Sequence, residues 1–157
     1  LADYGQSEPF SHRYLGHNSR LDTLQAAILA VKLPYLEDWT NKRRENAERY
    51  NRLFSNLPLK TPIVSKRAHH VYHLYVIEIE RRDECLSFLR ERSIMAQIHY
   101  KNLIYQQPCY SDLGYRQGDF PVAERVTSNI LSLPMYPELT DNQAKEVFAG
   151  LSEFLDK

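Results

Sequence analysis

The chain has 157 residues, 43% of them hydrophobic and 25% charged, which suits one soluble domain with a core and is too short for two ordinary domains. Its 20 Lys and Arg residues balance 20 Asp and Glu residues, so no electrostatic attraction to nucleic acid or to an anionic membrane is expected. No apolar run approaches the ~18 residues that span a bilayer, and two cysteines make no disulfide framework, so we expect a cytoplasmic protein.

The N-terminal third is predicted to be a loop followed by two helices. Residues 1–18 are expected to form the loop, and Ser19 and Asp22 stand three apart, as in a capping box at a helix start. Segment 21–33 is apolar nearly all round, so its helix should be buried on most faces, in a core or in a subunit interface. A second helix, started by a proline, runs to about Asn56. Its buried stripe is predicted to consist of Leu36, Trp39, Ala47, Tyr50, Leu53, Phe54 and Leu57.

Strands and helices are predicted to alternate through the rest of the chain. In order they are a strand over 71–80, a helix over 83–92, a strand over 94–100, an aromatic-rich loop over 101–118, a helix opened by Asp119 and Pro121, and a strand over 129–133. The first strand has apolar side chains on both faces, so both should be covered. Thr140 and Gln143 form a capping box for the last helix. The predicted class is α+β, a small sheet with helices and a long N-terminal helix.

The histidines and cysteines match no common metal or catalytic motif. Cys-x-x-Cys and His-Glu-x-x-His patterns are absent, and His70 and His73 fall on opposite faces of a predicted strand, so we expect no metal site. The chain also lacks a Gly-x-Ser-x-Gly elbow and a Walker lysine. Cys109 has no activating partner in the sequence and is expected to be an inert thiol.

Five blocks in order resemble the DegT/DnrJ/EryC1/StrS sugar aminotransferases and span nearly the whole chain. In the first, Gly16 precedes an asparagine and an arginine two apart, and a helix with Gln-Ala-Ala follows. The others are the helix with Trp39, Arg43 and Tyr50, the strand Tyr72–Ile77, the Ile98–Tyr100 strand, and Leu131–Pro137 with Leu139 and Thr140. The resemblance implies the C-terminal part of a dimeric pyridoxal-phosphate (PLP) enzyme of fold type I, with active sites at the subunit interface. Residues 1–33 would be a remnant of the cofactor-binding domain with an interface helix, and 34–157 the C-terminal small domain.

The same resemblance places the Schiff-base lysine upstream of the first block, where this chain has almost no residues. None of its seven lysines lies in a matching motif: Lys32, Lys42, Lys60, Lys66, Lys101, Lys145 and Lys157. Because PLP chemistry needs an amine to form the imine, we expect no transamination by the chain alone and assign no catalytic residue. The chain begins at Leu1 without a methionine, which also favours a fragment.

Two residues of the first block are candidates for cofactor binding. By the resemblance, Asn18 would donate a hydrogen bond to the cofactor phosphate of the partner subunit, a role that suits an amide. The alternative is that Asn18 only helps to start the helix. Arg20 would bind phosphate through two hydrogen bonds, or else pair with a carboxylate and hold the loop.

Four more residues are candidates for substrate binding. His12 and Tyr14 precede the first block and would line the sugar site, or pack within their own loop. His99 and Tyr100 belong to the Ile-His-Tyr block. The family continues that block with proline and then a second histidine, whereas residues 101–105 here are Lys-Asn-Leu-Ile-Tyr. This departure weakens the assignment of a sugar-binding role to the loop.

Three hypotheses of function follow. The first is part of an aminotransferase that moves an amino group from glutamate to a nucleotide-linked keto sugar. The second is a stand-alone, non-catalytic module that dimerises or binds a nucleotide sugar. The third, an unrelated α+β interaction domain, conflicts with the five ordered blocks. The first hypothesis predicts an exposed apolar patch on helix 21–33, or a tight non-native oligomer, because its packing partner would be missing.

Overall fold

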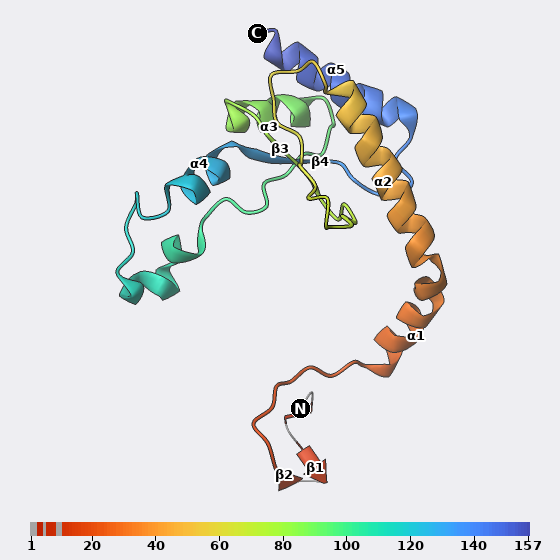
Figure 1. Ribbon diagram of the computed structural model, residues 1–157, viewed down its shortest axis with the longest axis vertical. Coiled ribbons are helices and arrows are strands. Elements are labelled where there is room, and N and C mark those ends of the chain that lie inside the picture. The colour runs from red at the N-terminus through yellow and green to blue at the C-terminus, as the bar shows by residue number, and fades with distance from the viewer. Residues whose placement is uncertain (1–2, 5, 9–10) are drawn as a thin grey trace. The chain divides into compact units, whose positions relative to one another are not determined.

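The computed structural model describes residues 3–4, 6–8 and 11–157 (Figure 1). Contacts divide the chain into two compact units, Leu1–Glu37 and Asp38–Lys157. Helices combine with small antiparallel sheets, so the chain is α+β, as predicted.

The first unit contains a short hairpin where the sequence predicts only a loop. Strand β1 (Gln6–Glu8) pairs with β2 (Ser11–His12), with Gln6 opposite His12. Helix α1 (Thr23–Lys32) follows, four residues after Ser19. Its N-cap residue is Asp22, whose side chain makes no capping hydrogen bond, so the predicted capping box at this helix start is wrong.

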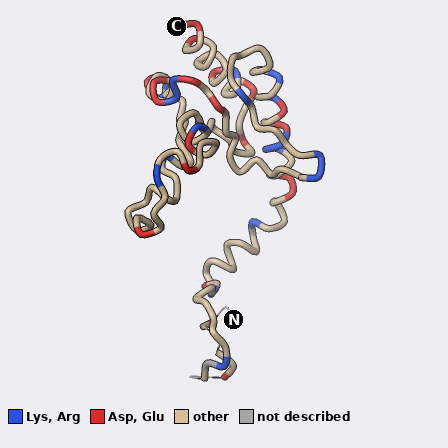
Figure 2. Tube along the Cα trace, turned by 60° about the vertical axis from the view of Figure 1, so that its left-hand side comes forward, with Lys and Arg blue, Asp and Glu red and all other residues tan. Residues whose placement is uncertain are grey.

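Helix α1 has no buried residue within this chain. Leu24 is 74% exposed and Val31 70% exposed, and the helix carries almost no charge apart from Lys32 at its end (Figure 2). The exposed apolar patch predicted for segment 21–33 is therefore present. The burial predicted for this helix, in a core or in a subunit interface, is not provided by the described part of this chain and stays a prediction.

A 3₁₀ turn, η1 (Leu33–Tyr35), contains the proline that precedes the second helix, α2 (Leu36–Leu53). Ala47, Tyr50 and Phe54 are buried, which confirms the centre of the predicted stripe. Leu36 is 55% exposed, against the prediction, because it belongs to the first unit and not to the core of residues 38–157.

The sheet of the second unit consists of β3 (Tyr75–Glu78) and β4 (Ile130–Leu133), which run antiparallel with Val76 opposite Ser132. An isolated bridge joins Lys60 to Glu78, and another joins Gln97 to Ser132, so β4 is bordered on both sides at Ser132. Side chains alternate along β3 between buried and half-buried, so only one of its faces is fully covered.

The strand predicted over 71–80 is shorter than expected, and the one predicted over 94–100 does not form. Before β3, the guanidinium of Arg43 donates to the carbonyls of Tyr72 (3.3 Å) and His73 (3.5 Å), so these carbonyls are not used by a strand partner. Tyr72 also has a left-handed backbone (φ 48°), which a strand cannot accommodate. Segment 94–100 makes one bridge, at Gln97, and is not a strand.

The remaining helices agree with prediction. They are α3 (Arg82–Glu91), α4 (Pro121–Asn129) and α5 (Asp141–Leu155), and the aromatic-rich loop contains two 3₁₀ turns, η2 (Ile104–Gln106) and η3 (Pro108–Leu113). Thr140 and Gln143 make the expected capping box, with a 2.9 Å bond from the Thr140 amide to Gln143 Oε1. Helix α3 packs against α5 and β4, and α4 against β3. The core is therefore one apolar cluster between the helices and the sheet, centred on Tyr50, Tyr75, Ile77, Leu131 and Leu151.

Candidate functional site

His99 is held by a buried serine of the central strand. Ser132 is 4% exposed, and its Oγ lies 2.9 Å from His99 Nδ1. The backbone of Gln97 exchanges two hydrogen bonds with Ser132 (3.0 and 2.8 Å), so the segment that carries His99 is fixed to β4 two residues before the histidine. The other ring nitrogen, Nε2, makes no hydrogen bond with the residues that the structure describes, and it remains able to bind a ligand.

Tyr100 lies beside His99 and is 79% exposed. The two ring centroids are 5.9 Å apart, and the rings are nearly perpendicular at 89°. Such an edge-to-face pair offers an aromatic surface with a hydroxyl and an imidazole nitrogen, which can contact both the apolar face and the hydroxyls of a sugar.

The chain that leaves β4 is held by one face of α2. Arg43 donates to the carbonyl of Met135 (2.8 Å), Asn46 to that of Tyr136 (2.8 Å), and Tyr50 to that of Pro134 (3.0 Å). The donors stand three and four residues apart, so they project from the same side of the helix. They pair three consecutive carbonyls that have no strand partner. These bonds fix to α2 the segment that directly follows β4 and Ser132.

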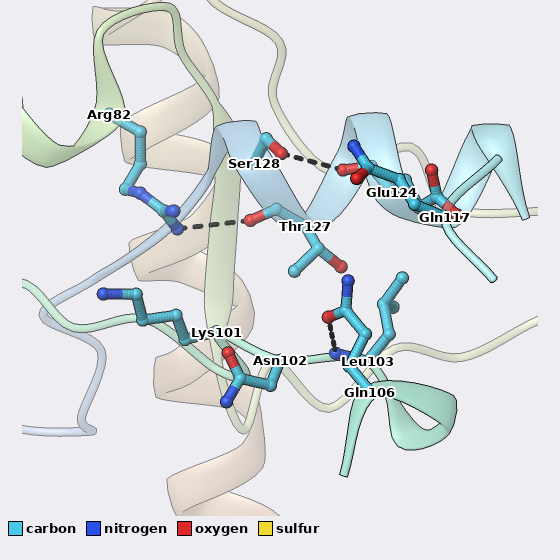
Figure 3. Close-up of a pocket in the computed structure, with 9 residues that line it drawn as sticks. All are labelled: Arg82, Lys101, Asn102, Leu103, Gln106, Gln117, Glu124, Thr127 and Ser128. Carbon is cyan, nitrogen blue, oxygen red and sulfur yellow. Dashed lines mark hydrogen bonds between the residues drawn. The ribbon is translucent and has the colours of Figure 1, made fainter. Parts of the chain in front are cut away.

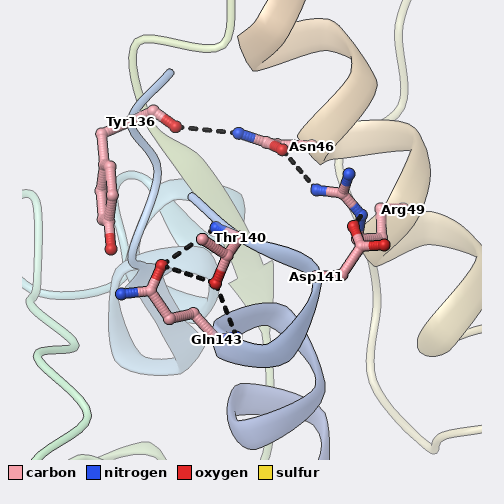
Figure 4. A network of polar contacts seen from close by, with 6 residues as sticks. All are labelled: Asn46, Arg49, Tyr136, Thr140, Asp141 and Gln143. Carbon is pink, nitrogen blue, oxygen red and sulfur yellow. Dashed lines mark hydrogen bonds and ion pairs between the residues drawn. The ribbon is translucent and has the colours of Figure 1, made fainter. Parts of the chain in front are cut away.

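A polar network extends this support to α5 (Figure 4). The buried Asn46 accepts a hydrogen bond from Arg49 through its own side-chain oxygen, and Arg49 Nε lies 2.6 Å from Asp141 at the start of α5. Burial raises the pKa of the Tyr50 hydroxyl above its ordinary value of 10.0, so this group stays a neutral donor even in alkaline solution. Thus α2 and α5 together hold the segment that follows β4, the strand that carries the Ser132 partner of His99.

The N-terminal candidates lie in the other unit. Asn18 is exposed and forms a backbone bridge with Asp3. Arg20 Nε is 3.9 Å from the Asp3 carboxylate, and since both side chains are exposed, this pair adds little stability. Asn18 precedes the N-cap residue by four positions, so it does not cap α1.

Tyr14 is exposed, with the Arg13 guanidinium 5.7 Å from its ring centroid. His12 belongs to β2, and its side chain lies outside the described part of the structure. Two groups of candidates are therefore brought together: His99 with Tyr100, and Asn18 with Arg20 through Asp3. Ser132 is not among the candidates suggested by the sequence, although a serine within a buried strand requires a hydrogen-bond partner, and that requirement is a usable signal.

The seven lysines of this chain do not fit the role of a Schiff-base lysine. All of them are exposed, whereas a reactive lysine needs a pKa lowered by burial or by a neighbouring cation. The pKa of Lys42 is instead raised, chiefly by its hydrogen bond to Asp38. Within the described ranges, no three His, Cys, Asp or Glu side chains lie close enough to hold a metal ion. In the same ranges no helix has the length and apolar character needed to cross a bilayer.

Residues 1–152 match the DegT/DnrJ/EryC1/StrS aminotransferase family, and the chain belongs to this family. It is 40% identical over 154 residues to a pleiotropic regulatory protein of Geobacillus stearothermophilus, covering 96% of this chain and 41% of the relative. It is 34% identical over 154 residues to a dTDP-3-amino-3,6-dideoxy-alpha-D-galactopyranose transaminase of Aneurinibacillus thermoaerophilus, covering 98% of this chain and 42% of that protein.

The fold has a close counterpart among solved structures. DesV of S. venezuelae, crystallised with a ketimine intermediate, superposes with a TM-score of 0.93 and 34% identity, over 100% of this chain and 43% of DesV. The predicted fold class is thereby confirmed. The chain spans less than half the length of these relatives.

Proposed function

We propose that this chain is the C-terminal part of a PLP-dependent aminotransferase that transfers an amino group, from glutamate, to a nucleotide-linked keto sugar. The observation that carries the proposal is the structural likeness to DesV over the whole chain, at 34% identity. The transaminase of Aneurinibacillus thermoaerophilus, whose name specifies a dTDP-linked amino sugar, supports a nucleotide sugar as the substrate class.

The chain contributes binding groups and not the covalent chemistry. Bound PLP supplies the electron sink for amino transfer, and the exposed lysines of this chain offer no suitable amine for it. Asn18 and Arg20 bind the phosphate of PLP across a homodimer interface, and the apolar face of α1 contributes to that interface. His99 and Tyr100, with Tyr14 and His12, contact the sugar. Residues 1–33 belong to the cofactor-binding domain and 34–157 to the small domain, in a cytoplasmic enzyme whose cysteines stay reduced.

A chimeric enzyme tests the proposal. In it, this chain replaces the matching part of the Aneurinibacillus thermoaerophilus transaminase, and amino transfer from glutamate to the keto sugar of that enzyme is measured. We expect a dimeric, active chimera. Asn18→Ala should weaken PLP binding, whereas Asn142→Ala, which removes an exposed asparagine of α5, should not. A folded, dimeric chimera without activity, or equal PLP affinity in both variants, would contradict the proposal.

The isolated chain provides a second test, by borohydride reduction in the presence of PLP followed by peptide mass mapping. We expect no stoichiometric adduct on any one lysine. An adduct on a single lysine would show that this chain carries the amine itself. A non-catalytic module that dimerises or binds a nucleotide sugar is the second candidate, because the exposed lysines and the exposed apolar face of α1 suit it equally well.

A further inference from the structure

A polar pocket opens between α4 and the turn that follows Tyr100. Its volume is about 320 Å³, which reaches the ~300 Å³ at which pockets for small molecules begin. Its polar lining residues include Arg82, Lys101, Asn102, Gln106, Thr127 and Ser128 (Figure 3). None of them is among the candidates that the sequence suggests for cofactor or sugar.

Arg82 brings a nearly buried positive charge to this pocket, with 6% of the residue exposed. Its Nη1 donates to the carbonyls of Thr127 (3.3 Å) and Ile130 (3.1 Å), which fixes the guanidinium at the end of α4. Nε lies 2.9 Å from a carboxylate oxygen of Asp83 without the alignment of a hydrogen bond, and the Asp83 side chain is 72% exposed, so water screens this ion pair. Nη2 makes no hydrogen bond with the described residues and stays available as a donor.

Lys101 adds a second cation at the same end of the pocket (Figure 3). Its ammonium group makes no ion pair or hydrogen bond with any residue in the described part of the chain. The pocket's described lining contains one carboxylate, Glu124, which already accepts hydrogen bonds from the Tyr105 hydroxyl (2.6 Å) and the Gly118 amide (2.9 Å). The lining therefore has a net positive charge and unused donors.

We propose that this pocket binds the phosphate group of a small molecule, held by Arg82 and Lys101. A fixed guanidinium edge suits phosphate oxygens, and a flexible ammonium can complete the contact as a point charge. The side-chain amide of Asn102 adds a neutral donor, whereas Gln106 Nε2 already donates to the Tyr105 hydroxyl (3.4 Å).

The test is a titration of the ¹⁵N-labelled chain with pyrophosphate, followed by the backbone amide signals. We expect shifts at residues 101–106 and 124–128. Lys101→Gln should weaken binding by about tenfold, the effect of losing one charge-assisted hydrogen bond, and Lys101→Arg should restore most of it. Lys145→Gln, which removes an exposed lysine of α5, is the matched control and should leave the affinity unchanged. Arg82 is not substituted, because its bonds to the α4 carbonyls also stabilise the fold.

Equal affinity in Lys101→Gln and Lys145→Gln would overturn the proposal, as would shifts confined to other regions. Equally strong binding of glutamate would overturn the choice of phosphate over carboxylate. Stronger, Lys101-dependent binding of UDP than of pyrophosphate identifies a nucleoside diphosphate as the source of the phosphate. Binding of pyrophosphate and inorganic phosphate without UDP identifies free phosphate instead. These measurements do not require amino transfer, so they are independent of the proposed enzymatic function.

Discussion

Replacement of Asn46 by alanine should destabilise the second unit more than any exposed amide replacement. The substitution removes the 2.8 Å bond to the Tyr136 carbonyl and the bond accepted from Arg49. A neutral hydrogen bond contributes about 1 kcal/mol and one to a charged group about 1.5–3 kcal/mol. The Arg49 side chain is 26% exposed and can be rehydrated, so the lower end of that range, about 1.5 kcal/mol, applies to its bond. The helix propensity of alanine is more favourable than that of asparagine by about 0.6 kcal/mol, which offsets part of the loss. We therefore expect a loss of about 2 kcal/mol.

Urea denaturation followed by circular dichroism measures this loss, with Asn142→Ala as the exposed control, for which we expect a change within about 0.5 kcal/mol. Hydrogen exchange gives a second readout. The amide of Leu139, which donates to the Tyr136 carbonyl (3.2 Å), should exchange faster in Asn46→Ala, because that segment loses its anchor on α2. Equal midpoints and equal slopes for the two variants would show that this network does not hold the exit of β4.

Three further predictions concern single groups. Arg125 lowers the pKa of the Glu78 carboxyl, so Arg125→Ala should reduce the free energy of unfolding at neutral pH by about 0.5 kcal/mol. The difference between the two proteins should vanish as the pH falls through the lowered pKa. A difference that does not depend on pH would contradict this account. Thr140→Ala should cost about 1 kcal/mol in urea denaturation through loss of the capping box, whereas an unchanged midpoint would refute its role. Burial raises the pKa of the Cys85 thiol to about 12, so a thiol reagent should modify the exposed Cys109 in the native chain and Cys85 only on unfolding.

The candidate site was only partly accessible from sequence. The Ile-His-Tyr block points to His99 and Tyr100, but its link to Ser132 joins positions 33 residues apart in the chain. The pocket beside it combines Arg82 from the start of α3, Lys101 from a turn and Thr127 from α4. No local pattern relates these segments, since their proximity results from the packing of three separate elements.

Local signals determined most of the regular structure. A threonine followed three residues later by glutamine starts α5, and prolines start η1 and α4. Apolar periodicity sets the buried centre of α2. The sequence suffices for these features because each of them depends on interactions within a few residues. Tertiary structure alone decided where β3 begins and whether segment 94–100 is a strand. The side chain of Arg43 takes the carbonyls that would extend β3, and Ser132 offers segment 94–100 one bridge. Long-range hydrogen-bond competition of this kind has no periodicity along the chain, so only the folded arrangement reveals it.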